Sequence, residues 1–238
     1  MNASLDLRAL RGLLFVLMAA FIVACDADSE SPPDPGAPSN VPAAKDLSAP
    51  DIPEDAPLVA FLGDSLAAGL HLSKAEAFPA VLQRRLARRA RPFRLVNAGV
   101  SGSTTAAGLS RVDWILDQNP DVVVVELGAN DGFRGIPVET VEENLRGIIA
   151  RIRERGAKPL LLGIRLPPNY GTGYATAFDA VYGKVAKAMD IPFVESFMAG
   201  VGGQPEMNLP DGIHPTPEGH ERLAENMEKA LSDLLSDL

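Results

Sequence analysis

Four short stretches of the sequence hold residue types suited to nucleophilic catalysis. They are Gly63-Asp64-Ser65-Leu66, Asn97–Gly102, Gly128–Asp131 and Asp211–Pro215. A serine hydroxyl is a weak nucleophile and needs an adjacent base to remove its proton. Imidazole titrates close to neutral pH, so it can take that proton and later return it to a leaving group. We therefore predict Ser65 as the nucleophile and His214, in the last stretch, as its base.

The other members of these stretches fit the same chemistry. Asp211 precedes His214 by three residues, close enough to accept the second ring N–H and fix the tautomer. Acyl transfer develops negative charge on the carbonyl oxygen, and preorganised N–H donors must stabilise it. Glycine lets a backbone N–H approach a ligand closely, and asparagine carries amide donors. Gly102 and Asn130 are residues of these types, although in isolation each is more simply interpreted as a turn glycine and a local backbone cap, respectively.

Several neighbouring polar residues have simpler interpretations. Asp64 and Asp131 are expected to brace turns by binding backbone groups. His71 and His220 have no carboxylate or histidine at ligand spacing in the sequence, so both are interpreted as surface or packing residues. The sequence predicts no metal site and no cofactor.

The elements that would position these stretches alternate along the chain. Short apolar runs predict strands at Leu58–Leu62, Leu95–Val96, Val122–Val125, Leu160–Leu162 and Phe193–Val194. Longer amphipathic patterns predict helices at Phe78–Ala90, Ala106–Gln118, Val138–Arg155, Ala177–Met189 and Pro217–Leu234. Strict alternation favours an α/β fold, a three-layer α/β/α sandwich with a mainly five-stranded parallel sheet. Sites in such folds form outside the carboxyl ends of the strands, where these stretches would lie.

The four stretches, in this order, resemble the four blocks of the SGNH/GDSL hydrolases. The longer segments VNAGVSGST, VVVELGANDGFRG, LLLGIRLPPNYG and DGIHP are similar to the thioesterase, lysophospholipase and arylesterase branch of that family. The resemblance implies a flavodoxin-like fold. It also implies an oxyanion hole made of the Ser65 and Gly102 backbone N–H groups and the Asn130 side chain.

The resemblance further implies an apolar groove for the acyl chain. Its walls map onto Gly132, Phe133, Arg134, Gly135, Ile136 and Pro137 after the Asn block, and onto Leu166, Pro167 and Tyr170. Phe78 stands where the branch has a tryptophan, and Ala129 replaces a glycine. The shape of the groove, and hence the preferred chain length, stays open at this point.

The N-terminal region reads as a targeting segment. Arg8 and Arg11 precede an apolar run from Leu13 to Val23, which is the layout of a secretory signal peptide. Ile22-Val23-Ala24-Cys25 resembles a bacterial lipobox, and Cys25 is the single cysteine. We expect a lipoprotein signal peptide over residues 1–24, lipidation at Cys25, a disordered Pro/Asp/Ser-rich tether over residues 25–57 and a hydrolase domain over residues 58–238. The expected location is the periplasmic side of the bacterial envelope, on either membrane.

The expected function is hydrolysis of small acyl or aryl esters, including lysophospholipid, by a monomer. The formal charge of −9 excludes a general nucleic-acid binder, because phosphate neutralisation needs a basic face. A carbohydrate O-acetylesterase of the envelope and a non-catalytic lipoprotein with the same fold remain alternatives. The basic run Arg84–Arg91 is either a solvated helix face or a contact with anionic lipid headgroups.

Overall fold

The computed structural model describes residues 47–238. The predicted signal peptide, Cys25 and most of the predicted tether lie outside the described residues. Among residues 47–238, every helix is too short or too polar to cross a membrane.

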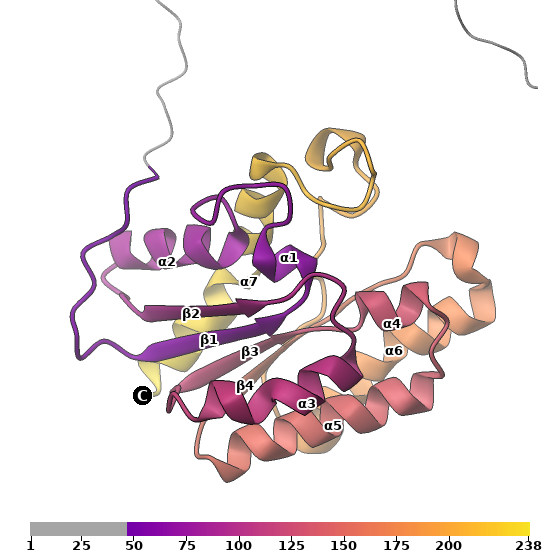
Figure 1. Cartoon of the computed structure of the whole chain (residues 1–238), viewed down its shortest axis with the longest axis horizontal. Coiled ribbons are helices and arrows are strands. Elements are labelled where there is room, and N and C mark those ends of the chain that lie inside the picture. Colours follow the sequence, from indigo (N-terminus) through magenta and orange to yellow (C-terminus); the bar gives the residue numbers. More distant parts are fainter. Residues whose placement is uncertain (1–46) are drawn as a thin grey trace, which may run out of the picture. The chain divides into compact units, whose positions relative to one another are not determined.

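A single parallel sheet forms the middle layer of the described domain (Figure 1). Its strands are β1 (Leu58–Gly63), β2 (Arg94–Gly99), β3 (Val122–Glu126), β4 (Lys158–Leu162) and β5 (Phe193–Val194). They lie in the order β2-β1-β3-β4-β5, and all four neighbouring pairs are parallel. Every residue of β1 and β3 is buried, which explains why these two strands are almost continuously apolar.

Helices cover both faces of the sheet, so the predicted three-layer fold is confirmed (Figure 1). On one face α2 (Phe78–Arg88) packs against α7 (Pro217–Ser236). On the other face α5 (Val138–Glu154) lies between α3 (Thr105–Leu116) and α6 (Thr172–Met189). The remaining short elements are α1 (Ser65–Ala68), α4 (Ala129–Phe133) and the 3-10 turns η1 (Pro168–Tyr170) and η2 (Pro205–Met207).

All five predicted strands and all five longer helices are present, and their ends differ from the prediction by a few residues. The largest difference is α6, which begins at Thr172 rather than Ala177. Its first turn is rich in glycine and threonine and therefore carries a weak helical pattern. The short helices α1 and α4 had no periodic signal, because each lasts about one turn.

The residues directly before the predicted start of the domain at residue 58 contact the folded domain. Ala56 is buried, and its carbonyl accepts a hydrogen bond from Arg94 Nε at 2.8 Å. The carbonyl of Pro57 accepts another from the Arg94 N–H at 2.8 Å. These bonds continue the pairing of β1 with β2 to the residues just before Leu58, so Ala56 and Pro57 contact the folded domain.

The basic run on α2 is mostly committed to contacts within the protein. Arg84 is buried, and its Nη1 donates to the carbonyl of Ala75 at 2.7 Å. Arg85 and Arg89 both pair with Glu228 of α7, each at 2.8 Å. Arg84 and Arg85 are thus held by contacts within the protein, whereas Arg88, Arg89 and Arg91 are exposed. Contact of the run with lipid headgroups stays a prediction.

Candidate active site

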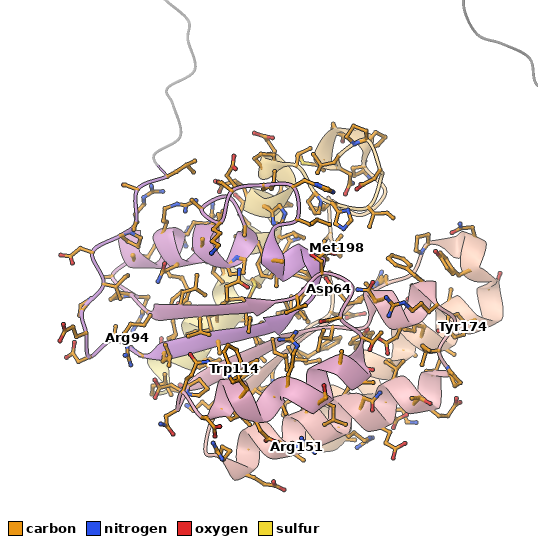
Figure 2. All side chains as sticks on the ribbon, viewed as in Figure 1. Asp64, Arg94, Trp114, Arg151, Tyr174 and Met198 are labelled. Carbon is orange, nitrogen blue, oxygen red and sulfur yellow. The ribbon has the colours of Figure 1, made fainter. Side chains whose placement is uncertain are left out.

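The four sequence stretches meet at the carboxyl edge of the sheet. Ser65 begins α1 directly after β1, Gly102 follows β2, and Asn130 lies in the first turn of α4 after β3. The order of the strands reverses between β1 and β3, which is the position where open α/β sheets bind ligands. Figure 2 shows Asp64 at this edge and Arg94 at the opposite end of the sheet.

Ser65, His214 and Asp211 form a continuous hydrogen-bonded chain. His214 Nε2 lies 3.0 Å from Ser65 Oγ, and His214 Nδ1 lies 2.6 Å from Asp211 Oδ2. The two ring nitrogens therefore have different partners, which fixes the tautomer with Nδ1 protonated and Nε2 free to accept a proton. Residues 149 positions apart in the sequence are brought together as the sequence predicts.

Asp211 is itself held in place by its own loop. Its Oδ1 accepts the backbone N–H groups of Ile213 at 2.9 Å and His214 at 3.0 Å. The hydrogen bond from the His214 ring, followed by these two backbone bonds, holds the pKa of Asp211 well below its usual range. The carboxylate thus stays ionised beside the imidazole, although it is partly exposed to solvent.

Asn130 presents its amide nitrogen toward the same edge. Nδ2 donates to Asp64 Oδ2 and to the Ser103 carbonyl, each at 3.1 Å. These two bonds identify which amide atom is the donor and fix the orientation of the group. An oxyanion would be a third acceptor for Nδ2, so one of the present bonds must be shared with it or released to it.

A buried pair of carboxyl groups supports the nucleophile turn, and the sequence analysis missed one of its members. Glu126, the last residue of β3, is fully buried, and its Oε2 accepts the N–H groups of Asp64 and Ala67 at 3.2 Å each. Burial, and then repulsion by the Asp64 charge, raise the pKa of Glu126 well above its usual value. Burial also raises the pKa of Asp64 to about 6. Burial therefore favours the protonated form of Glu126.

Arg111 of α3 is a second residue that the sequence analysis missed. Its Nη1 donates to the Ala98 carbonyl at 2.6 Å, and its Nη2 donates to the Gly63 carbonyl at 2.8 Å. One guanidinium thus joins the carboxyl ends of β1 and β2. Because Ser65 and Gly102 follow these two strands, Arg111 adds a support to this end of the β1–β2 pair beyond the backbone pairing of the strands.

The predicted groove walls lie on either side of the end of α4. The rings of Phe133 and Tyr170 are 5.7 Å apart, and both side chains are exposed. Tyr174 Oη donates to the Ile136 carbonyl at 2.6 Å, and Figure 2 shows Tyr174 on α6 beside this segment. Arg134 Nη2 donates to the Gly102 carbonyl at 3.2 Å. The Phe133–Pro137 segment therefore contacts both the loop that carries Gly102 and helix α6.

Three of the predicted groove residues have other positions. Phe78 is fully buried between the rings of Phe61 and Phe197, so it belongs to the core and does not line a groove. Leu166 is also buried, and a Cβ at Gly132 would lie 2.4 Å from its side chain. Gly132 and Leu166 thus join the two walls instead of facing the substrate. Gly135, Pro137 and Pro167 are exposed, as groove residues should be.

The two remaining histidines differ from each other. His220 is buried as a packing residue, and its Nδ1 accepts the Phe78 N–H at 3.1 Å. His71 is exposed, as predicted for a surface residue, and its ring lies against that of His214 with centroids 5.8 Å apart. One ligand atom each of His71, Asp211 and His214 lies within 4.8 Å of the others. The sequence could not reveal this cluster, since its members are about 140 positions apart.

Comparison with known proteins agrees with this geometry. Residues 61–222 match the model of the GDSL-like Lipase/Acylhydrolase family. The chain is 45% identical to Esterase TesA of Pseudomonas aeruginosa, over 73% of this chain and 87% of that protein. It is 42% identical to the Escherichia coli K12 protein named Thioesterase 1/protease 1/lysophospholipase L1, over 74% and 83% of the two chains.

A solved structure entitled "Crystal Structure of TesA" superposes with a TM-score of 0.71 at 44% identity, covering 74% of this chain and 98% of that one. The family match spans more than half of the chain, and the matched range includes all four stretches that meet at the edge of the sheet. The chain therefore belongs to the GDSL-like lipase/acylhydrolase family and is an SGNH serine esterase.

Proposed function

We propose that Ser65, His214 and Asp211 are the catalytic triad of an esterase that hydrolyses acyl and aryl esters. The observation that carries this proposal is the pair of bonds on His214, to Ser65 Oγ at 3.0 Å and to Asp211 Oδ2 at 2.6 Å. Ser65 Oγ attacks the carbonyl carbon while His214 Nε2 takes its proton. His214 then protonates the departing alcohol, and water enters by the same steps to release the acid.

Three N–H donors are assigned to stabilise the negative charge on the tetrahedral intermediate. Ser65 is the first residue of α1, so its N–H has no intrahelical acceptor. The Gly102 N–H and Asn130 Nδ2 complete the set. Loss of one such donor typically lowers turnover by about 10²–10³-fold.

The substrate we propose carries an apolar acyl or aryl group, as lysophospholipids do. Exposed apolar side chains on the loops of this edge support this choice, namely Val100, Phe133, Tyr170 and Ile213. The relative in Vibrio mimicus, 38% identical over 71% of this chain and 86% of that protein, is named Arylesterase. A carbohydrate O-acetylesterase would have little use for apolar residues around its nucleophile.

A series of 4-nitrophenyl esters, from acetate through butyrate and octanoate to dodecanoate, tests this function. The wild type is expected to hydrolyse the series with a preference beyond acetate, and Ser65→Ala to lose at least about 10⁴-fold in kcat. Phe133→Ala should lower kcat/KM for octanoate more than for acetate. Preference for acetate alone would support the O-acetylesterase, and equal activity of Ser65→Ala would refute the triad.

We also propose that the esterase is held at the bacterial envelope by lipid on Cys25. The lipobox-like Ile22–Cys25 after an apolar run supports this location. In cells, Cys25→Ser should move the activity from the membrane fraction to the soluble fraction. An unchanged membrane fraction would refute the anchor and leave the catalytic proposal untouched.

A further inference from the structure

His71, Asp211 and His214 form a cluster of potential metal ligands at the opening of the active site. One ligand atom from each lies within 4.8 Å of the other two, a combination that occurs once in residues 47–238. His71 and Asp211 are exposed, and His214 is partly buried. An ion in solvent can therefore reach all three side chains without a change in the fold.

The loop that follows the nucleophile delivers His71 to this cluster. After α1 the chain turns through Gly69 and His71, both in the left-handed region with φ of 67° and 71°. The Leu70 N–H donates to the Ser65 carbonyl at 3.1 Å, and the Leu72 N–H donates to the Gly69 carbonyl at 2.9 Å. The His71 ring consequently stands edge-on to the His214 ring, with an interplanar angle of 84°.

We infer that His71, Asp211 and His214 bind one Zn²⁺ ion and that this ion inhibits the esterase. Two imidazoles and a carboxylate, with water in the fourth position, are a common ligand set for zinc. Ligand atoms around tetrahedral zinc lie roughly 3.3 Å apart. The longest separation in the cluster, which is at most 4.8 Å, must therefore shorten by up to about 1.5 Å, and the 2.6 Å pair of Asp211 Oδ2 and His214 Nδ1 must open by about 0.7 Å. Rotation of the exposed His71 and Asp211 side chains allows both changes.

The Asp211 oxygen and the His214 nitrogen that would bind zinc are also the atoms through which Asp211 orients His214 in catalysis. Asp211 Oδ1 is occupied by two backbone N–H groups, so Oδ2 is the oxygen available to an ion. Oδ2 presently binds His214 Nδ1 at 2.6 Å. A zinc ion between these atoms takes the place of the Nδ1 proton, and the neutral ring then carries its proton on Nε2. An Nε2–H group cannot accept the proton of Ser65, so the base is lost while the ion is bound.

The zinc site itself does not depend on the proposed function, whereas inhibition does. Two measurements on the full chain separate them. Isothermal titration calorimetry with ZnCl₂ in a non-coordinating buffer measures binding without any substrate. Hydrolysis of 4-nitrophenyl butyrate over the same zinc range measures inhibition and its reversal by EDTA. Saturable binding by a chain that hydrolyses no ester would refute the triad and leave the metal site intact.

His71→Asn is the decisive variant, because asparagine tolerates the left-handed backbone and removes the imidazole. We expect unchanged basal hydrolysis and a rise of at least about tenfold in the zinc concentration for half-inhibition, since losing even an indirect partner of a metal costs that much. His71→Asp restores a ligand oxygen and should recover most of the zinc affinity.

The expected wild-type result is one zinc bound per chain, with the same midpoint for binding and inhibition. Equal inhibition of wild type and His71→Asn would show that zinc acts without His71 and would overturn the inference. Absence of saturable binding to wild type at millimolar zinc would overturn it as well.

Discussion

Glu126 accepts a hydrogen bond from the backbone N–H of Asp64, so the last residue of β3 holds the turn that carries the nucleophile. The same oxygen, Oε2, also accepts the Ala67 N–H. The other oxygen, Oε1, is buried and has no hydrogen-bond partner among the described residues. Burial, and then the nearby charge of Asp64, raise the pKa of Glu126 and favour a neutral carboxyl group at this position.

Glu126→Gln should be tolerated and Glu126→Ala should not. Glutamine replaces the protonated acid almost exactly in shape, whereas alanine leaves two buried N–H groups without an acceptor, which costs about 2–4 kcal/mol of unfolding free energy. Urea denaturation at pH 7 measures both values. An alanine variant as stable as the wild type would contradict the role assigned to this carboxyl group.

The raised pKa values of Asp64 and Glu126 predict how the stability of the protein changes with pH. Both folded-state pKa values lie above the ordinary ones, so the folded protein binds more protons than the unfolded chain once the pH exceeds about 4. The stability contributed by the pair is full below that pH and is lost as the pH rises through the folded values. Glu126→Gln removes one member, so its stability relative to wild type should improve from pH 5 to pH 8. A constant difference in Tm would contradict this account.

His220 should lower the stability of the folded protein at acid pH, whereas Asp64 and Glu126 lower it as the pH rises. Burial, assisted by the charge of His214, lowers the pKa of His220 to about 4. Below pH 6.5 the unfolded chain takes up a proton that the folded protein refuses, so stability falls by up to about 3 kcal/mol as the pH approaches 4. His220→Gln keeps an acceptor for the Phe78 N–H and cannot be protonated. Its Tm should therefore decline less than that of the wild type over this range, and parallel declines would refute the assignment.

Arg111→Gln should lower catalysis more than stability alone explains. Without the two bonds to Ala98 and Gly63, the turns that follow β1 and β2 lose a support beyond the backbone pairing of the strands, and a displacement of about 1 Å at a reacting group can cost 10²-fold. We expect kcat for 4-nitrophenyl butyrate to fall by about 10–100-fold in the folded variant. Arg151→Gln is the matched control, because Arg151 of α5 likewise binds a carbonyl, that of Leu109, but lies far from Asp64 in Figure 2. Equal losses in both variants would contradict a positioning role.

Tyr174→Phe should loosen the Phe133–Pro137 segment. The variant removes the hydrogen bond to the Ile136 carbonyl, worth about 1 kcal/mol, and leaves the ring in place. Since the segment forms the proposed acyl wall, KM for the octanoate ester should rise about fivefold while that for acetate stays constant. A uniform change across the ester series would indicate that the segment does not contact the acyl chain.

The layered fold followed from the sequence because its strongest signals are local. β3 is apolar throughout, and α5 and α7 have long amphipathic patterns, so their existence was predictable and only their ends shifted. That Ser65, Gly102 and Asn130 lie at one edge was also predictable, because parallel strands bring their carboxyl ends together. Their assignment as oxyanion donors came from the resemblance of the four stretches to the SGNH/GDSL hydrolases.

The roles of Glu126 and Arg111 could not be predicted from local sequence patterns, because they depend on contacts between distant segments. Glu126 ends an apolar strand, and a charged residue at that position is a signal that could have indicated a buried acid. Arg111 sits on a helix among polar residues and looks like a surface residue until its carbonyl partners are known. Phe78 was wrongly predicted to line the groove. Its correspondence to a tryptophan of the family carried no information about its burial in the core.

The most direct test of the central claim, that Ser65 is activated by His214, is labelling of the folded chain with a fluorophosphonate. Peptide mass spectrometry then locates the adduct. Activation of Ser65 by His214 predicts one adduct per chain on Ser65. The adduct should be absent in Ser65→Ala and should form much more slowly in His214→Ala. A folded wild-type protein with no adduct on Ser65, or with equal labelling of His214→Ala, would contradict it.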